Sequence, residues 1–209
     1  MRDHVSMRAF VALTPPPEAV ADLSDFLTPR REVRTGSTGG TRSIGSMTPR
    51  WTRDEHLHLT LAFLPELADR DLEELTQRLA EAADRRACGE LRLTGGGAFP
   101  SACAARVLWI GIEPQEARDD LSRLAGSVRT ASGVAGVRVQ GGEFRPHLTV
   151  ARTGRAQEVT RWLRVLDTYD GPTWRPREMA LVRSYLGQGP RRTPRYETLQ
   201  TFPLAGASL

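Results

Sequence analysis

Short segments in which hydrophobic and polar positions alternate, or in which a few apolar residues run together, occur along the whole chain and predict β-strands. Glycine, proline and other turn-forming residues separate them, which is typical of strands joined by short connections. The predicted strands cover residues 8–13, 56–64, 91–94, 106–112, 137–140, 146–152, 178–186 and 196–204. Three consecutive glycines, Gly95, Gly96 and Gly97, are predicted to form a turn between the third and fourth strands.

Other segments carry apolar residues three or four positions apart, which is the spacing of one face of an amphipathic helix. Leu72, Leu75 and Leu79 are an example. The helices predicted in this way run approximately over residues 17–27, 68–86, 114–133 and 159–166. Helices interspersed with strands that are joined by short turns predict an α+β fold with antiparallel sheets.

One five-residue pattern occurs twice, as HLTLA at residues 58–62 and as HLTVA at residues 147–151. In both copies His, Thr and Ala alternate with aliphatic residues, so the His and the Thr are predicted to face the same side of a strand. The copies begin 89 positions apart in a chain of 209 residues. This separation predicts two pseudo-symmetric lobes, each an antiparallel sheet with flanking helices, whose motif strands face each other across a central groove.

The organised pattern covers residues 7–204, which we interpret as a single bilobal domain preceded by an N-terminal extension over residues 1–6. Residues 28–50 consist mainly of Gly, Ser, Thr, Pro and Arg and are predicted to be a flexible insertion. They are not a domain boundary, because the strand and helix before them are too small to fold alone. The arginines of this segment either contact an anionic substrate or remain solvated.

The composition restricts the class of protein. With 39% hydrophobic residues the chain can bury a core. It has no run of 18 apolar residues and no secretory leader pattern, which predicts a cytoplasmic protein without a membrane span. Cys88 and Cys103 match no metal or redox spacing and are predicted to be reduced. All 29 basic residues are Arg and the net charge is +4. A phosphate-rich ligand is compatible with this excess, but a GC-rich genome produces the same bias.

Two facing histidines are suited to the opening of a cyclic phosphodiester. A pair of imidazoles near neutrality can hold one proton, so that one takes a proton from water while the other gives one to the departing oxygen. The two threonines of the motifs would donate hydrogen bonds to the non-bridging phosphate oxygens. This chemistry needs no metal ion, and it predicts a bell-shaped pH profile. The alternative is a pair of partly buried histidines that only satisfy hydrogen bonds.

His56 and His58 form a His-x-His pair, which in other proteins binds zinc. No third ligand of a suitable type lies nearby in the sequence, so no metal site is predicted. His56 is instead expected at the edge of the groove or in solvent.

At this level of detail the chain resembles the two-histidine (2H) phosphoesterase superfamily, and within it the LigT-type RNA 2',3'-cyclic phosphodiesterases. The resemblance extends from Met7 to Leu204. It is carried by residues 8–13 before the prolines, 56–64 as the first signature, Phe99-Pro100 with 106–111 as a middle block, 144–152 as the second signature, and Ser184-Tyr185-Leu186 with Tyr196 and Leu199.

This resemblance implies an enzyme that hydrolyses RNA-terminal 2',3'-cyclic phosphate to a 2'-phosphate without a metal or other cofactor. It implies that His58 and His147 are the acid–base pair and that Thr60 and Thr149 bind the phosphate. We assign His58 as the acid toward the leaving O3' and His147 as the base on water, although the roles can be exchanged. Arg152 is implied as a phosphate or base contact. Strict alternation would turn it away from His147, so this role requires a bulge near residue 151.

The sequence departs from the family pattern at two places: Pro65 replaces a usual Gly, and the segment 28–50 is longer than usual. Phe10 either stacks on a base or belongs to the core. Three other functions stay open: 2'-5' RNA ligation, hydrolysis of a small cyclic or 2',5'-linked nucleotide, and non-catalytic binding of RNA ends. The partners are expected to be RNA ends or nucleotides with a 2',3'-cyclic phosphate, and the protein is expected to be a monomer.

Overall fold

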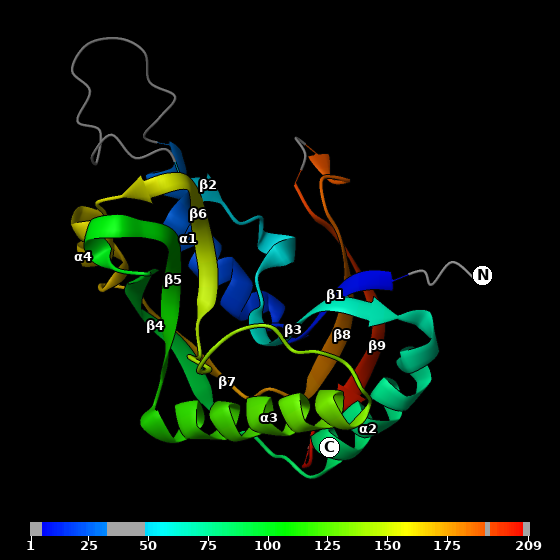
Figure 1. Cartoon of the computed structure of the whole chain (residues 1–209). Coiled ribbons are helices and arrows are strands. Elements are labelled where there is room, and N and C mark those ends of the chain that lie inside the picture. Colours follow the sequence, from blue (N-terminus) through cyan, green and yellow to red (C-terminus); the bar gives the residue numbers. More distant parts are fainter. Residues whose placement is uncertain (1–5, 33–48, 191–192, 207–209) are drawn as a thin grey trace, which may run out of the picture.

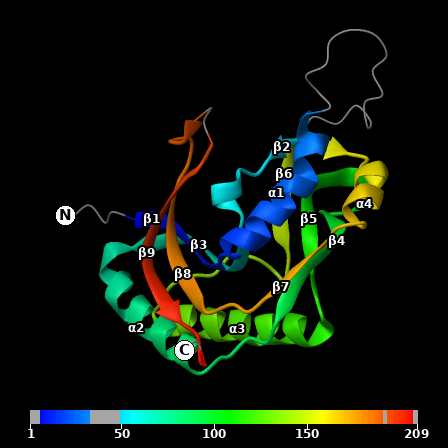
Figure 2. The same ribbon diagram turned by 180° about the vertical axis from the view of Figure 1, so that it is seen from behind.

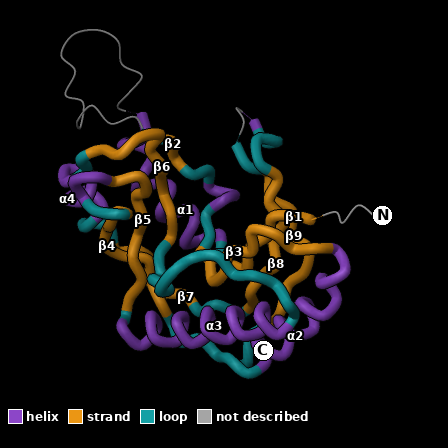
Figure 3. Tube along the Cα trace, viewed as in Figure 1, coloured by secondary structure: helices purple, strands orange, loops and turns teal. Residues whose placement is uncertain are grey.

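The protein folds into two antiparallel β-sheets that lie side by side with helices around them (Figure 1). This computed structural model describes residues 6–32, 49–190 and 193–206. Figure 3 shows the strands as two groups, with α2 and α3 along their lower edge. The predicted α+β class with two antiparallel sheets is confirmed.

The first sheet has the strand order β3-β1-β8-β9, and the second has the order β2-β6-β5-β4-β7. The strands of the first sheet are β1 (Ser6–Leu13), β3 (Leu59–Ala68), β8 (Glu178–Tyr185) and β9 (Arg195–Pro203). Those of the second are β2 (Arg50–Trp51), β4 (Leu91–Phe99), β5 (Ala105–Glu113), β6 (Leu148–Gln157) and β7 (Asp170–Trp174).

The helices are α1 (Pro17–Glu32), α2 (Leu72–Asp84), α3 (Gln115–Val134) and α4 (Thr160–Leu166), with short 3-10 turns η1 (Asp54–His56), η2 (Asp69–Asp71) and η3 (Ala102–Ala104). Helix α3, at the bottom of Figure 1, contacts β3 of the first sheet and β5 of the second. It therefore packs against both lobes. Seen from behind, α1 covers the second lobe beside β7 (Figure 2). Within the described ranges, none of the helices has the length and apolar character needed to cross a membrane.

The two motif strands carry the same irregularity. In the pairing of β3 with β1, Ala62 lies opposite Val11 and Thr60 lies opposite Ala12, so Leu61 is an extra residue. In the pairing of β6 with β5, Ala151 lies opposite Leu108 and Thr149 opposite Trp109, so Val150 is the extra residue. A bulge of this kind resets the alternation of side chains.

The bulge decides which residues share the face of the threonines. In each motif strand two consecutive residues are buried where the bulge occurs, namely 61–62 and 150–151. The next residue, Phe63 in β3 and Arg152 in β6, then lies on the same face as Thr60 and Thr149. The bulge that a role for Arg152 requires is therefore present.

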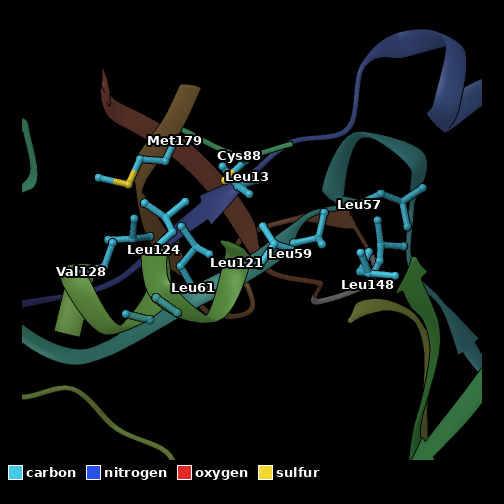
Figure 4. Close-up of a cluster of buried hydrophobic side chains, with 14 of the residues drawn as sticks. Leu13, Leu57, Leu59, Leu61, Cys88, Leu121, Leu124, Val128, Leu148 and Met179 are labelled. Carbon is cyan, nitrogen blue, oxygen red and sulfur yellow. The ribbon is translucent and has the colours of Figure 1, made fainter. Parts of the chain in front are cut away.

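The leucines of the two motif strands are buried in the hydrophobic core. Leu59 and Leu148, each directly after a motif histidine, are 1% and 0% exposed. Figure 4 shows them with Leu57 in one cluster with Leu121 of α3. Burying a leucine contributes about 1.5–3 kcal/mol. Because these leucines are fixed in the core, the threonines that alternate with them must face the other way.

The prediction of a turn at the three glycines is wrong, because β4 continues through them and pairs with β5. Gly95 has a positive φ of 65° at a break in the pairing. A Cβ atom on Gly97 would overlap the indole of Trp109. Glycine therefore allows the Trp109 ring to lie flat on its own sheet, where it contacts the ring of Phe99 at a centroid distance of 5.3 Å.

The segment predicted to be a flexible insertion, 28–50, begins with the last turn of α1, which extends to Glu32. Arg31 pairs with Asp54 at 3.1 Å and Ser24 donates a hydrogen bond to the same carboxylate at 2.6 Å, which holds that last turn against η1. The prediction is therefore wrong for residues 28–32, while residues 33–48 lie outside the described part, as do residues 1–5.

Other strand predictions also differ from the structure. Strand β3 begins at Leu59 and not at residue 56, because residues 54–56 form η1. Residues 137–140 contribute only an isolated bridge between Gln140 and Phe63. Strand β7 was not predicted, because its sequence, DGPTW, has Gly and Pro at its centre.

Candidate active site

The two motif histidines are held in the same way. Each precedes its strand, and each places Nδ1 2.7 Å from the carbonyl oxygen two residues upstream, which is that of His56 for His58 and that of Arg145 for His147. A carbonyl oxygen only accepts hydrogen bonds, so Nδ1 carries the hydrogen and donates it. This leaves Nε2 of each neutral imidazole free to accept a proton.

Residues of both motif strands line one cavity of about 260 Å³. Thr60 and His58 reach it from the first lobe, and Thr149 and Arg152 from the second. The full lining is Arg8, Phe10, Thr52, His56, His58, Thr60, Phe63, Thr149, Arg152, Ser184, Leu186, Pro194 and Tyr196. The described residues of this lining include two arginines and no carboxylate, so their fixed charge favours an anion. A larger cavity of about 580 Å³ between α2 and α3 has no motif residue in its lining.

Aromatic rings support His58 on the side of the first lobe. The ring of Phe10 stacks on it at a centroid distance of 4.6 Å and an angle of 20°. Tyr196 meets His58 edge-on at 5.7 Å and also contacts His56 at 4.6 Å. Phe10 is only 5% exposed and lines the cavity, so it is both a core residue and part of the site wall.

His147 has a different aromatic support. Phe99 meets its ring edge-on at 4.9 Å, and Trp109 lies at a centroid distance of 6.1 Å. His147 is not among the residues that line the cavity, but its proximity lowers the pKa of His58.

Burial keeps both histidines neutral near pH 7. It lowers the pKa of His58 to about 4, opposed by the hydrogen bond to the His56 carbonyl and assisted by the charge of Arg152. Burial also lowers the pKa of His147, again opposed by its backbone hydrogen bond and assisted by Arg152. Arg152 therefore lies close enough to act on both imidazoles. An anion bound between them would raise both pKa values.

The residues singled out from the sequence meet as follows. His58, Thr60, Thr149 and Arg152 line one cavity, and His147, which does not line it, is close enough to lower the pKa of His58. His56 packs on Tyr196. Among the described residues, no three His, Cys, Asp or Glu side chains gather as metal ligands would.

Sequence reasoning missed several lining residues, namely Arg8, Thr52, Ser184 and Pro194. They lie outside the two five-residue motifs, and their residue types alone carry no signal. The phase of the alternation could have identified Arg8, because it lies two positions before Phe10 on the same strand.

Comparison with known sequences gives a consistent family assignment. The sequence profile described as the 2'-5' RNA ligase superfamily matches residues 16–188. An RNA 2',3'-cyclic phosphodiesterase of Geobacillus stearothermophilus is 33% identical over 159 residues, which are 75% of this chain but only 48% of that protein. The chain thus spans about half the length of this relative. A protein of the same name from Archaeoglobus fulgidus is 29% identical over 197 residues, 94% of this chain and 99% of its own.

Solved structures agree with the sequence comparison. The protein TT0787 of Thermus thermophilus is 28% identical with a TM-score of 0.70, covering 96% of this chain and 99% of its own. LigT of E. coli in complex with 3'-AMP has a TM-score of 0.70 at 23% identity, with 96% and 99% covered, and therefore shares the fold. The resemblance to the LigT-type proteins is thus confirmed, and this chain belongs to the 2'-5' RNA ligase superfamily of two-histidine phosphoesterases.

Proposed function

We propose that this protein hydrolyses the 2',3'-cyclic phosphate at the end of an RNA to a 2'-phosphate, without a metal ion, through His58 and His147. The observation that carries the proposal is the pair of imidazoles, each held through Nδ1 and each followed by a Thr that lines the same cavity. The names of the relatives support the substrate class.

The phosphate would be held by groups from both lobes. The hydroxyls of Thr60 and Thr149 would donate hydrogen bonds to the non-bridging oxygens, one from each motif strand. Arg152 would supply the positive charge, since its guanidinium forms no hydrogen bond or ion pair with any described residue. Both contributions stabilise the charge that grows on these oxygens as the attacking water approaches phosphorus.

The two imidazoles would then move protons in opposite directions. Nε2 of His147 takes a proton from water while the water oxygen forms a bond to phosphorus. The bond from phosphorus to O3' breaks, and Nε2–H of His58 gives its proton to O3'. The products are a 2'-phosphate and a free 3'-hydroxyl. We assign the acid to His58 because it lies on the aromatic wall of Phe10 and Tyr196, against which the nucleoside would rest.

The low pKa of His58 is compatible with a role as acid. In the free protein this imidazole is neutral at pH 7, because its pKa is about 4. The substrate brings a negative charge next to it and offsets the charge of Arg152, so a proton is taken up as the phosphate binds. The proton that His58 takes up in the complex is then available to O3' as it departs.

The test of the proposed function is an assay with an oligoribonucleotide that ends in a 2',3'-cyclic phosphate, with EDTA present. We expect hydrolysis to continue at an undiminished rate and to yield the 2'-phosphate. Restoration of activity only by added metal would contradict the mechanism. Tight binding of the RNA end without turnover would instead identify a non-catalytic binding module.

The pH dependence provides a second prediction. The reaction needs one protonated and one neutral imidazole, so kcat/KM, which reports the free enzyme, follows the singly protonated pair. The pKa of His58 is about 4 and that of His147 lies below its ordinary 6.5. As the pH increases, kcat/KM should therefore rise with a midpoint near pH 4, and then decrease with a midpoint below pH 6.5. The profile of kcat should lie at higher pH, because the bound phosphate raises both pKa values. A kcat/KM that stays flat from pH 4 to pH 8 would contradict an acid–base pair.

A second candidate is 2'-5' RNA ligation, which the description of the family favours. A 5'-hydroxyl of another RNA would take the place of water, and the same two histidines would serve. Supplying a 5'-hydroxyl oligonucleotide in the assay distinguishes the two reactions, because ligation gives a joined product and hydrolysis a 2'-phosphate.

A further inference from the structure

Arg8 is a second arginine of the cavity, and the two motifs do not account for it. It lies on β1 and lines the cavity together with Arg152. Its guanidinium lies over the ring of Phe63, 4.8 Å from the centroid. Within the described part of the chain, Arg8 forms no hydrogen bond or ion pair, and the cavity lining holds no carboxylate. Its donors are therefore available to a ligand.

The pseudo-symmetry of the lobes gives Arg8 a defined place. Phe63 follows His58 as Arg152 follows His147, five positions later and after the same bulge. Where the second lobe has the guanidinium of Arg152, the first lobe has the Phe63 ring with the guanidinium of Arg8 on it. Both lobes thus present a positive charge to the cavity, but in the first lobe it comes from the neighbouring strand.

Arg8 and Arg152 reach the cavity from different strands. Arg152 lies on β6 and its charge lowers the pKa of both motif histidines, whereas Arg8 lies on β1 with its guanidinium over the Phe63 ring. Arg8 and Phe10 are two positions apart on β1, and Phe10 stacks on His58. Arg8 therefore belongs to the wall of the cavity on the side of His58.

We propose that Arg8 binds a second phosphate, on the 5' side of the terminal nucleoside, and so favours substrates that carry one. This inference rests on the proposed function, in which His58 protonates O3' and the ribose lies on its side of the cavity. The 5' carbon of that ribose would then lie against the wall to which Arg8 belongs. A guanidinium suits this task because it offers paired donors to phosphate oxygens. The second phosphate belongs either to the RNA chain or to a mononucleotide.

The test compares three substrates: adenosine 2',3'-cyclic phosphate with a 5'-hydroxyl, the same nucleotide with a 5'-phosphate, and the dinucleotide ApA with a terminal cyclic phosphate. We expect kcat/KM to be about tenfold higher for at least one substrate with a second phosphate than for the nucleotide with a 5'-hydroxyl. This is the effect of one charge-assisted hydrogen bond. Preference for the dinucleotide identifies the RNA chain as the source, and preference for the 5'-phosphate alone identifies a mononucleotide.

The variant Arg8→Met keeps an unbranched apolar stem on Phe63 and removes the charge. We expect it to bring the ratio of kcat/KM between phosphorylated and 5'-hydroxyl substrates to about one, and Arg8→Lys to restore part of the ratio. Arg183→Met is the matched control, because Arg183 also lies over an aromatic ring, that of Tyr185 at 4.6 Å, and does not line the cavity. It should leave the ratio as in the wild type.

Two results would overturn the inference: a wild-type protein without preference for a second phosphate, or an Arg8→Met variant that keeps the preference. Binding of adenosine 2'-phosphate and adenosine 2',5'-bisphosphate, measured by calorimetry, makes the same comparison without turnover. A protein that hydrolyses none of the substrates but binds the bisphosphate more tightly through Arg8 would refute the proposed function and support the role of Arg8. Equal binding of the two ligands by wild type and variant would refute that role alone.

Discussion

Replacing either motif histidine by Asn is expected to lower kcat for a 2',3'-cyclic phosphate by about 10²–10⁴-fold. An Asn amide can still donate a hydrogen bond to the carbonyl that now accepts from Nδ1, of His56 or of Arg145. It cannot take up or release a proton. The loss therefore reports proton transfer and not a displaced loop. The measurement is single-turnover hydrolysis of a cyclic oligonucleotide end.

The double variant His58→Asn/His147→Asn should be only slightly slower than each single variant. The two histidines act in the same step, so the loss of one removes most of the contribution of the other. Thermal unfolding and binding of inorganic phosphate provide the control that the fold and cavity persist. If one of the single variants retained the wild-type kcat, that histidine would have no part in proton transfer and the proposed reaction would have to be abandoned.

The second large effect is expected for the threonines. Thr149→Val and Thr60→Val keep the shape of the side chain and remove the hydroxyl, so each should lower kcat by about 10²–10³-fold, as for the loss of one donor to a developing oxyanion. The corresponding Ser variants should retain most of the activity, since they keep the hydroxyl. KM should change less than kcat, because the hydrogen bond strengthens as charge grows in the transition state.

Thr130→Val is a suitable control for this series, because Thr130 is exposed on α3 and does not line the site cavity. It should have the wild-type kcat. A loss at Thr149 that appears only in KM would mean that the hydroxyl binds the ground state and the transition state equally, and this would contradict its role in stabilising the developing charge.

The two lobes repeat one design with different surroundings. Both present a histidine held through Nδ1 and a Thr before a bulge, but His58 lies under Phe10 and Tyr196, while His147 lies against Phe99. Like groups in unlike environments acquire different proton affinities, and this is what an acid and a base need.

The monomeric state and the cytoplasmic location stay predictions, as does the single bilobal domain over residues 7–204.

The sequence alone determined the parts of the molecule that depend on local alternation. The motif pattern identified both histidines and both threonines, because a period of two commits the intervening leucines to the core and their neighbours to the other face. Leu59 and Leu148 are indeed buried. Helical spacing located the four helices for the same reason, since each has one apolar stripe that must be covered.

Tertiary structure alone decided the features that depend on packing between distant segments. The bulge at Val150, which brings Arg152 to the face of Thr149, is a matter of pairing with β5. The glycines of β4 lie in a strand because they pair with β5, and Gly97 leaves the space that the ring of Trp109 occupies. The low pKa of His58 comes from burial among rings, and Arg8 enters the cavity only because β1 pairs with β3. Alternation is a property of neighbours in the chain, whereas register, burial and charge at a cavity arise only when remote segments meet.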